Sequence, residues 1–231
     1  MVTQLLFGEM FELLDEQEKW SKVRLDADGY ECWVDNKQIT PVSSEEYSAL
    51  RASTPFKSTD PMSSIVSGSG TMLIPMGSSL PGLSDSKFTI TGITYAFNGT
   101  AMDSSLERRS TIPNIAMQFL NTPYLWGGRS TAGIDCSGFT QVVHSLAGIQ
   151  LPRDAYQQAD LGAHVELSKA RPCDLAFFRN NDGRITHVGI VLEDHKIIHA
   201  SGKVRIDRLT AKGIETTSDE LTHTLAHISR L

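Results

Sequence analysis

The spacing of apolar residues changes once along this chain, near Asp103, and that change constrains the fold more than any other feature. Before it, apolar and polar side chains alternate in short runs broken by Gly, Pro or charged residues, which is typical of antiparallel strands. After it, apolar residues recur at helical spacing, and from Ala170 onward the strand pattern returns. Helices followed by strands predict an α+β layout with a mostly antiparallel sheet.

On this basis the 231 residues divide into three parts. Residues 1–40 predict a small β-barrel, to whose core Trp20 and Trp33 would add bulk. Residues 41–104 predict a linker with a helix start in SSEEYSAL, followed by a second small β-barrel. Residues 105–231 predict the α+β domain. The chain is therefore expected to be a multidomain protein.

Composition excludes several classes of partner. The formal net charge is -6 and no Lys/Arg run reaches five, which argues against a nucleic acid or an anionic membrane. No apolar run approaches the roughly 18 residues of a membrane span. The N-terminal MVTQLLFGEMFELLDE lacks the basic region and apolar core of a signal peptide, so we expect a cytoplasmic protein, and we expect a monomer.

Three cysteines without close spacing argue against a disulfide framework and a Cys-rich zinc site. Cys32 and Cys173 are interpreted as structural. Cys136 lies at the first turn of a helix predicted over residues 136–147, where free N–H groups and the helix dipole should lower the thiol pKa. Taken alone, a buried structural role is the commoner one for such a residue.

Two histidines change that interpretation. Strand alternation places His187 on one face with Gly189, and a three-residue hairpin loop would set His199 opposite Gly189. A helix-start Cys packed against that face would complete a nucleophile, a base and an orienting group. A zinc site formed by Cys136, His187 and His199 is the alternative. The remaining histidines are expected at the surface or in turns: His144, His164, His195, His223 and His227.

Six short motifs then carry a resemblance. They are P-Y-L-W-G-G and D-C-S-G-F within 123–139, L-P-R-D at 151–154, D-L-A-F-F at 174–178, H-V-G-I-V at 187–191 and I-H-A-S at 198–201. Together they resemble the NlpC-type papain-like cysteine peptidases, which cut cell-wall peptides. The resemblance covers roughly residues 115–205. It implies Cys136 as nucleophile, His187 as general base and His199 as the residue that orients the base, without a metal or other cofactor.

With its bacterial SH3-like N-terminal half, the chain resembles the subgroup of γ-D-glutamyl-L-diamino acid endopeptidases. That resemblance implies a short murein peptide as partner, such as L-Ala-γ-D-Glu-diaminopimelate or its L-Lys counterpart, with a free N-terminal amine. The bond cut would join γ-D-Glu to the diamino acid. The substrate-binding residues it implies are Tyr124, Trp126, Asp135 and Ser137 around the nucleophile, with Glu9 and Tyr30 from the first barrel at the amine end.

Two departures from the family pattern are visible. Ala155 follows L-P-R-D where members often carry Ser, so one polar contact to substrate is expected to be missing or replaced. Family barrels usually have a strand before the one matching VTQLLFGE, so either the barrel of residues 1–40 lacks that strand or the sequence shown is shortened. Three alternatives stay open: an endopeptidase acting on intact exported wall, a non-catalytic wall-peptide binding protein, and an acyltransferase or amidase with the same triad.

Overall fold

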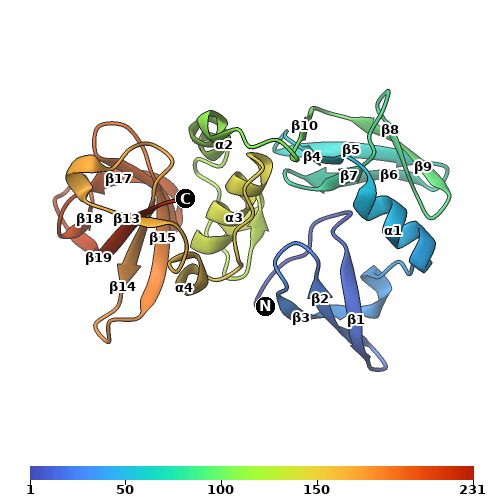
Figure 1. Ribbon diagram of the computed structural model, residues 1–231, viewed down its shortest axis with the longest axis horizontal. Helices are drawn as coiled ribbons and strands as arrows, with labels where there is room; N and C mark the ends of the chain where they lie inside the picture. The colour runs from blue at the N-terminus through green and yellow to red at the C-terminus, as the bar shows by residue number, and fades with distance from the viewer.

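The structure is a computed structural model and describes residues 1–231. Small sheets built from the N-terminal residues lie at one end of the molecule, and a barrel built from the C-terminal residues lies at the other (Figure 1). Three helices, α2, α3 and α4, lie between them. None of the helices combines the length and the hydrophobicity that a membrane-spanning helix requires.

The first sheet contains β1 (Phe11–Glu16), β2 (Trp20–Leu25) and β3 (Glu31–Asp35) in antiparallel order. Its inner face buries Val23, Leu25, Cys32 and Val34. Trp20 and Trp33 have the opposite parity along their strands and are 50% and 44% exposed. The prediction that they fill the core is therefore wrong, because the alternation turns both rings toward solvent.

Residues 41–104 contain α1 (Ser44–Ala52), whose first turn is capped by Ser43 Oγ accepting from the Glu46 N–H at 3.2 Å. Two small sheets follow, in the strand orders β10-β4-β7 and β6-β5-β9-β8. Their strands are β4 (Pro55–Ser58), β5 (Met62–Ser67), β6 (Gly70–Pro75), β7 (Ser79–Pro81), β8 (Lys87–Ile90), β9 (Ile93–Asn98) and β10 (Ala101–Asp103). Strands were expected here. As in the first sheet, however, the ladders stay open, and the closed barrel belongs to the C-terminal part.

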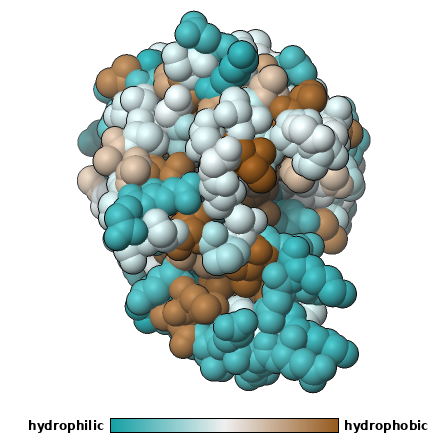
Figure 2. Space-filling model, turned by 90° about the vertical axis from the view of Figure 1, so that its right-hand side faces the viewer, coloured by the Kyte–Doolittle hydropathy of each residue, from teal (hydrophilic) through white to brown (hydrophobic).

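A cavity of about 290 Å³ lies where the first sheet, α1 and the β8–β9 sheet meet. Its lining is mostly apolar and includes Leu5, Phe7, Val34, Leu50 and Ile90. Figure 2 shows this end of the molecule, with hydrophobic residues gathered across the middle of the face and hydrophilic residues in its lower half.

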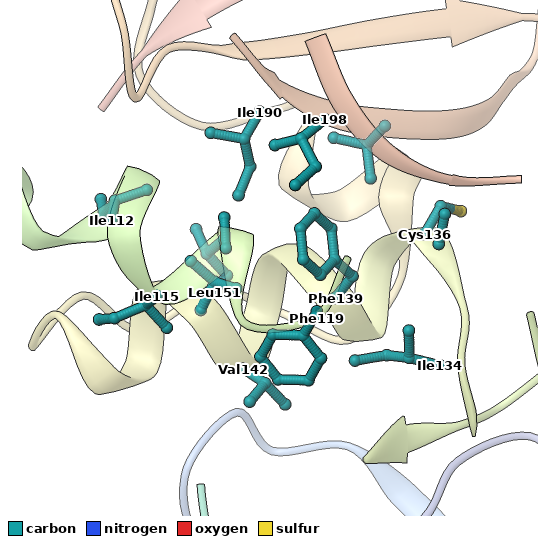
Figure 3. Packing of buried hydrophobic residues seen from close by; sticks show 14 of the residues in the cluster. Ile112, Ile115, Phe119, Ile134, Cys136, Phe139, Val142, Leu151, Ile190 and Ile198 are labelled. Carbon is teal, nitrogen blue, oxygen red and sulfur yellow. The ribbon is translucent and has the colours of Figure 1, made fainter. Parts of the chain in front are cut away.

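The central helices are α2 (Ile112–Met117), α3 (Cys136–Leu146) and α4 (Ala155–Gln158). Every residue of α3 is buried, because the helix lies between the two ends of the molecule (Figure 1). Its apolar face packs with Ile112, Ile115 and Phe119 from the α2 segment (Figure 3). The hairpin of β11 (Arg129–Ser130) and β12 (Gly133–Ile134) leads directly into α3.

The C-terminal strands run antiparallel in the order β13-β19-β14-β15-β16-β17-β18, and β18 also pairs with β19. That last pairing closes six strands into a barrel, a closure that the predicted antiparallel sheet did not specify. The ten-residue strand β19 makes closure possible by pairing with three partners. The strands are β13 (Ala163–Val165), β14 (Leu175–Arg179), β15 (Ile185–Val191), β16 (Lys196–Ser201), β17 (Lys203–Leu209), β18 (Gly213–Glu215) and β19 (Leu221–Arg230).

The barrel strands have two apolar faces. The outer face, with Val188, Ile190 and Ile198, packs against α3. The inner face carries Phe178, Val191, Ile197, Leu209 and Ile214. The face on which a histidine lies therefore decides whether its ring contacts the barrel interior or the side covered by α3.

Candidate active site

Cys136 is the first residue of α3, as the sequence predicted, and it is 7% exposed. Asp135 is the helix N-cap, and its Oδ1 accepts from the Gly138 N–H at 2.6 Å. Its Oδ2 accepts from the Gly127 N–H at 2.8 Å. One carboxylate therefore ties the glycine loop to the start of the helix and fixes the position of the thiol.

Arg153 holds the same carboxylate from the other side. It is 1% exposed, and its Nη2 and Nη1 donate to Asp135 Oδ2 and Oδ1 at 2.6 and 3.1 Å. Its Nη1 also donates to Ser137 Oγ at 2.9 Å. In the structure, Asp135 and Ser137 are therefore both engaged by Arg153, beside the nucleophile.

The two histidines lie as the register argument predicted, with His199 paired to Gly189. Nε2 of His187 is 2.8 Å from Nδ1 of His199. A Cβ on residue 189 would come within 2.8 Å of His199 Cβ, so glycine is required for the rings to share this face. Both rings lie on the barrel's inner face with Phe178. The sequence analysis placed Cys136 against this face, whereas in the structure Cys136 belongs to the core cluster of the opposite face, which α3 covers.

Cys136 instead reaches the barrel from the end of α3. Figure 3 shows its side chain at the edge of the packed core. The main-chain N–H of Val188, the residue after His187, lies against the sulfur. The thiol therefore lies against the backbone of the residue that follows His187, at the N-terminal end of α3.

A fourth residue extends the relay, and the sequence analysis missed it. Nε2 of His199 lies 3.0 Å from Oδ2 of Asp207, which also accepts from Arg205 Nε at 2.7 Å. Burial raises the pKa of Asp207, but the hydrogen bonds from His199 and Arg205 outweigh it and the net pKa is lowered. The signal was present in KVRIDRL, where alternation places Arg205 and Asp207 on one face and pairs Arg205 with His199.

The carboxylate of Asp207 decides the tautomers along the relay. An ionised carboxylate only accepts, so His199 carries its proton on Nε2 and accepts at Nδ1. His187 then donates from Nε2, which leaves its Nδ1 as the acceptor of the neutral ring. The order His187, His199, Asp207 therefore forms a hydrogen-bonded chain with one direction.

Electrostatics at the thiol contradict the sequence-based expectation of a lowered pKa. Burial, and then the Asp135 carboxylate, raise the pKa of Cys136 to about 11, against the smaller opposing effect of the Val188 and Ser137 N–H groups. Burial, and then His199 and His223, hold the pKa of His187 well below its usual value. Both shifts favour the neutral form, a thiol at Cys136 and an uncharged imidazole at His187.

Three other residues that the sequence analysis named for substrate binding, Tyr124, Trp126 and Tyr30, differ in how far they are buried. Tyr124 is half-buried, and burial, then Cys136 and Asp135, raise its pKa to about 12. Trp126 is 70% exposed. Tyr30 is partly buried, and its pKa is raised by burial and then by Asp154. The structure thus brings Tyr124 and Tyr30 to the neighbourhood of Cys136 and of the L-P-R-D segment, respectively.

Glu9 is not open to a ligand's amine. Its two carboxylate oxygens accept from Arg129 Nη1 and Nη2 at 2.9 and 2.8 Å, and one also accepts from the Leu6 N–H at 2.8 Å. Both side chains of this ion pair are over nine-tenths buried. Burial raises the pKa of Glu9, but Arg129, Lys57 and the Leu6 N–H together outweigh it and the net pKa is lowered. The pair joins the N-terminal part to the loop beside the nucleophile.

Further contacts join residues 1–4 to the loop beside Cys136 and to Arg153. Gln4 Oε1 accepts from the Arg129 N–H at 2.8 Å, and Thr3 Oγ1 accepts from Arg153 Nε at 2.9 Å. A Cβ on Gly127 would lie 3.0 Å from the carbonyl oxygen of Met1. The first residues of the chain therefore cover one side of the site.

Three more residues differ from their expected settings or were overlooked. His144 is buried in α3, and burial lowers its pKa to about 4, so the surface assignment is wrong. His223 is half-buried, and its ring stacks on His187 with 4.2 Å between centroids. Asp154 is half-buried and forms no ion pair, and burial raises its pKa. It stands in the quoted L-P-R-D motif, which could have identified it.

The fold and this relay define a cysteine peptidase of papain-like type. The chain belongs to the NlpC/P60 family, whose model matches residues 121–222, as the motif resemblance indicated. A second model, the bacterial dipeptidyl-peptidase Sh3 domain, matches residues 1–39. The protein is therefore a hydrolase with a peptidase domain and an N-terminal SH3 domain.

Two relatives and one solved structure resemble most of the chain. The γ-D-glutamyl-L-lysine dipeptidyl-peptidase of Bacillus subtilis (strain 168) is 30% identical over an alignment of 213 residues, and the match covers 86% of this chain and 71% of that one. The protein of the same name from Bacillus cereus (strain ATCC 10987 / NRS 248) is 28% identical, over 86% of this chain and 66% of its own length. The crystal structure of an NlpC/P60 family protein from Bacillus cereus ATCC 10987 superposes with a TM-score of 0.84 at 25% identity, covering 99% of this chain and 81% of that one.

Proposed function

We propose that this protein releases L-Ala-γ-D-Glu from short murein peptides with a free N-terminal L-Ala, by cutting the bond to the diamino acid. The observation that carries the proposal is the contact of residues 1–9 with the loop beside Cys136, which closes one side of the site. A cleft closed on one side favours short peptides with a free end over a continuous polymer. The names of the two Bacillus relatives support the same bond. We propose that the role is recycling of wall peptides in the cytoplasm.

The proposed reaction uses the relay in order. Nδ1 of His187 accepts the proton of Cys136 as the sulfur attacks the γ-glutamyl carbonyl carbon. The main-chain N–H of Cys136, at the unpaired start of α3, donates to the developing oxyanion. The tetrahedral intermediate expels the diamino acid, whose amine takes the proton from His187. Water, deprotonated by His187, then hydrolyses the thioester and releases the dipeptide.

The free amine needs a carboxylate partner with no other cation. Glu9, expected at the amine end, and Asp135, expected around the nucleophile, are both committed to arginines. Asp154 forms no ion pair and lies beside Tyr30 of the N-terminal unit. We therefore assign the ammonium to Asp154 and Tyr30, with Glu9 acting indirectly by holding Arg129.

Two peptides test the substrate class: L-Ala-γ-D-Glu-L-Lys and its N-acetylated form, each also prepared with diaminopimelate in place of Lys. Mass spectrometry should show cleavage of the free-amine peptides alone, at the bond after γ-D-Glu, and Cys136→Ala should abolish it. Cleavage of acetylated and free peptides alike would replace the proposal with an endopeptidase of open cleft. If none of the peptides is cleaved, the protein would instead be interpreted as a non-catalytic protein that binds wall peptides.

The amine assignment has its own test. Asp154→Asn should raise KM for the free-amine peptide by about 10- to 100-fold, the loss expected for one hydrogen bond to a charged group. Asp160→Asn, on an exposed residue six positions away, is the matched control. An unchanged KM in Asp154→Asn would show that a group other than Asp154 binds the ammonium of the substrate.

A further inference from the structure

A cluster of three imidazoles lies inside the barrel mouth, and the relay uses only two of them. His187, His199 and His223 come from β15, β16 and β19, and their ligand nitrogens all lie within 4.8 Å of one another. The ring of His223 stacks on His187 and lies edge-on to His199, with centroids 4.2 and 5.6 Å apart. His223 is partly exposed, whereas the other two are buried, so it marks the side open to solvent.

We propose that these three histidines form a reversible inhibitory site for Zn²⁺. Three imidazoles and a water are a common donor set for this ion, with Zn–N distances of about 2.0–2.1 Å. Tetrahedral ligands at that distance lie about 3.3–3.4 Å apart. The His187 and His199 nitrogens now lie 2.8 Å apart, so they need to separate by only about half an ångström, and the ion replaces the proton between them.

The outer partners of the cluster have the arrangement that metal-binding histidines use. Such a histidine usually holds its second ring nitrogen on a carboxylate or another polar group. Nε2 of His199 is held by Asp207 at 3.0 Å, which turns Nδ1 into the cluster. Nδ1 of His223 is held by Thr222 Oγ1 at 2.9 Å, which leaves Nε2 for a metal. Two of the three rings are therefore already oriented as ligands.

Zinc at this site blocks the relay by changing one tautomer. A metal on Nε2 of His187 forces the proton of the neutral ring onto Nδ1. Nδ1 is the nitrogen that must accept the thiol proton, so the base is lost while the metal is bound. Removing the metal returns the proton to Nε2 and restores the hydrogen bond to His199.

The inhibition rests on the proposed peptidase function, but metal binding does not, so the two are measured separately. Binding is read with Co²⁺ on the full chain carrying Cys136→Ala, because tetrahedral nitrogen-ligated Co²⁺ absorbs visibly and no catalytic thiol is present to contribute. We expect one Co²⁺ per chain, displaced by Zn²⁺. The band should be lost when His223→Phe is added, since Phe keeps the stacked ring without a ligand nitrogen.

Inhibition is read as the zinc concentration that halves cleavage of the free-amine peptide, relative to metal-free activity of the same variant. His223→Phe should raise that concentration by more than about tenfold, since even outer partners of a metal site change affinity 10–100-fold. EDTA should restore wild-type activity.

His164→Phe is the matched control, because His164 stacks on His227 at 4.3 Å in a pair that lacks a third imidazole. His223→Gln serves if the Phe variant fails to fold. No Co²⁺ band in Cys136→Ala, or equal zinc sensitivity of wild type and both His223 variants, overturns the proposal, since zinc would then act on the thiol alone. A Co²⁺ band in Cys136→Ala, together with no cleavage of the free-amine peptide by the wild-type protein, would keep the metal site and reject the proposed function.

Discussion

Nε2 of His187 and Nδ1 of His199 lie 2.8 Å apart, on strands whose register places Gly189 between them. This contact links the base to Asp207, and through Asp207 to Arg205. The orientation of the base therefore depends on residues up to twenty positions beyond it along the chain.

Asp207→Asn should lower kcat without raising KM, because the amide can donate to His199 and reverse the tautomers that leave Nδ1 of His187 as acceptor. The loss should reach about 100-fold, the lower end of what a positioned general base contributes. Steady-state kinetics on the free-amine peptide measure it. Asp194→Asn, on a side chain 82% exposed in the neighbouring hairpin, should leave both constants unchanged. Equal kcat values for the two variants would show that Asp207 does not orient the relay.

Gly189→Ala should impair both stability and turnover. The added methyl group would meet His199 Cβ and Ile197 Cδ1 at 2.8 Å, so either the rings move apart or the strands do. Overpacking of this kind costs about 1–3 kcal/mol. Urea unfolding and kcat measure the two effects. Gly68→Ala is the control, since nothing lies within 4 Å of a Cβ there. Retention of full activity would contradict the requirement for glycine between the histidines.

Glu9→Gln should destabilise the protein by about 3–5 kcal/mol, because it leaves the buried guanidinium of Arg129 without its counter-charge. The free energy of unfolding from urea titration measures this. Glu12→Gln breaks an exposed pair with Arg24 and should have a much smaller effect. A large rise in KM for the free-amine peptide with unchanged stability would instead place Glu9 in contact with the substrate.

His144 should make the fold acid-sensitive. Burial lowers its pKa from 6.5 to about 4, and its Nε2 has no partner in α3 or around it. Between pH 6.5 and pH 4, His144 therefore binds a proton in the unfolded chain but not in the folded chain. The contribution of neutral His144 to the free energy of unfolding is complete above pH 6.5. It is lost as the pH falls toward 4 and amounts to on the order of 3 kcal/mol in total. His144→Gln should flatten the fall in unfolding free energy between pH 7 and pH 5, whereas exposed His164→Gln should not. An unchanged slope in His144→Gln would show that His144 is not the group responsible.

Local features of the sequence determined much of the site. The helix start at Cys136, its Asp135 cap and the pairing of Gly189 with His199 follow from residues close together in the chain, where spacing and alternation act directly. The six motifs identified the family for the same reason, since each is a short continuous segment. The wrong exposure of Trp20 and Trp33 came from ignoring the alternation that their own strands show.

Tertiary structure alone decided the rest. Closure of the barrel by β18 and β19, the stacking of His223 on His187, and the pairing of Glu9 with Arg129 across 120 positions depend on contacts that no local pattern encodes. The thiol pKa also reversed direction, because burial and a neighbouring carboxylate outweighed the helix start. Spacing specifies which groups share a face, but desolvation and long-range partners specify their charge, and these exist only once the chain has folded.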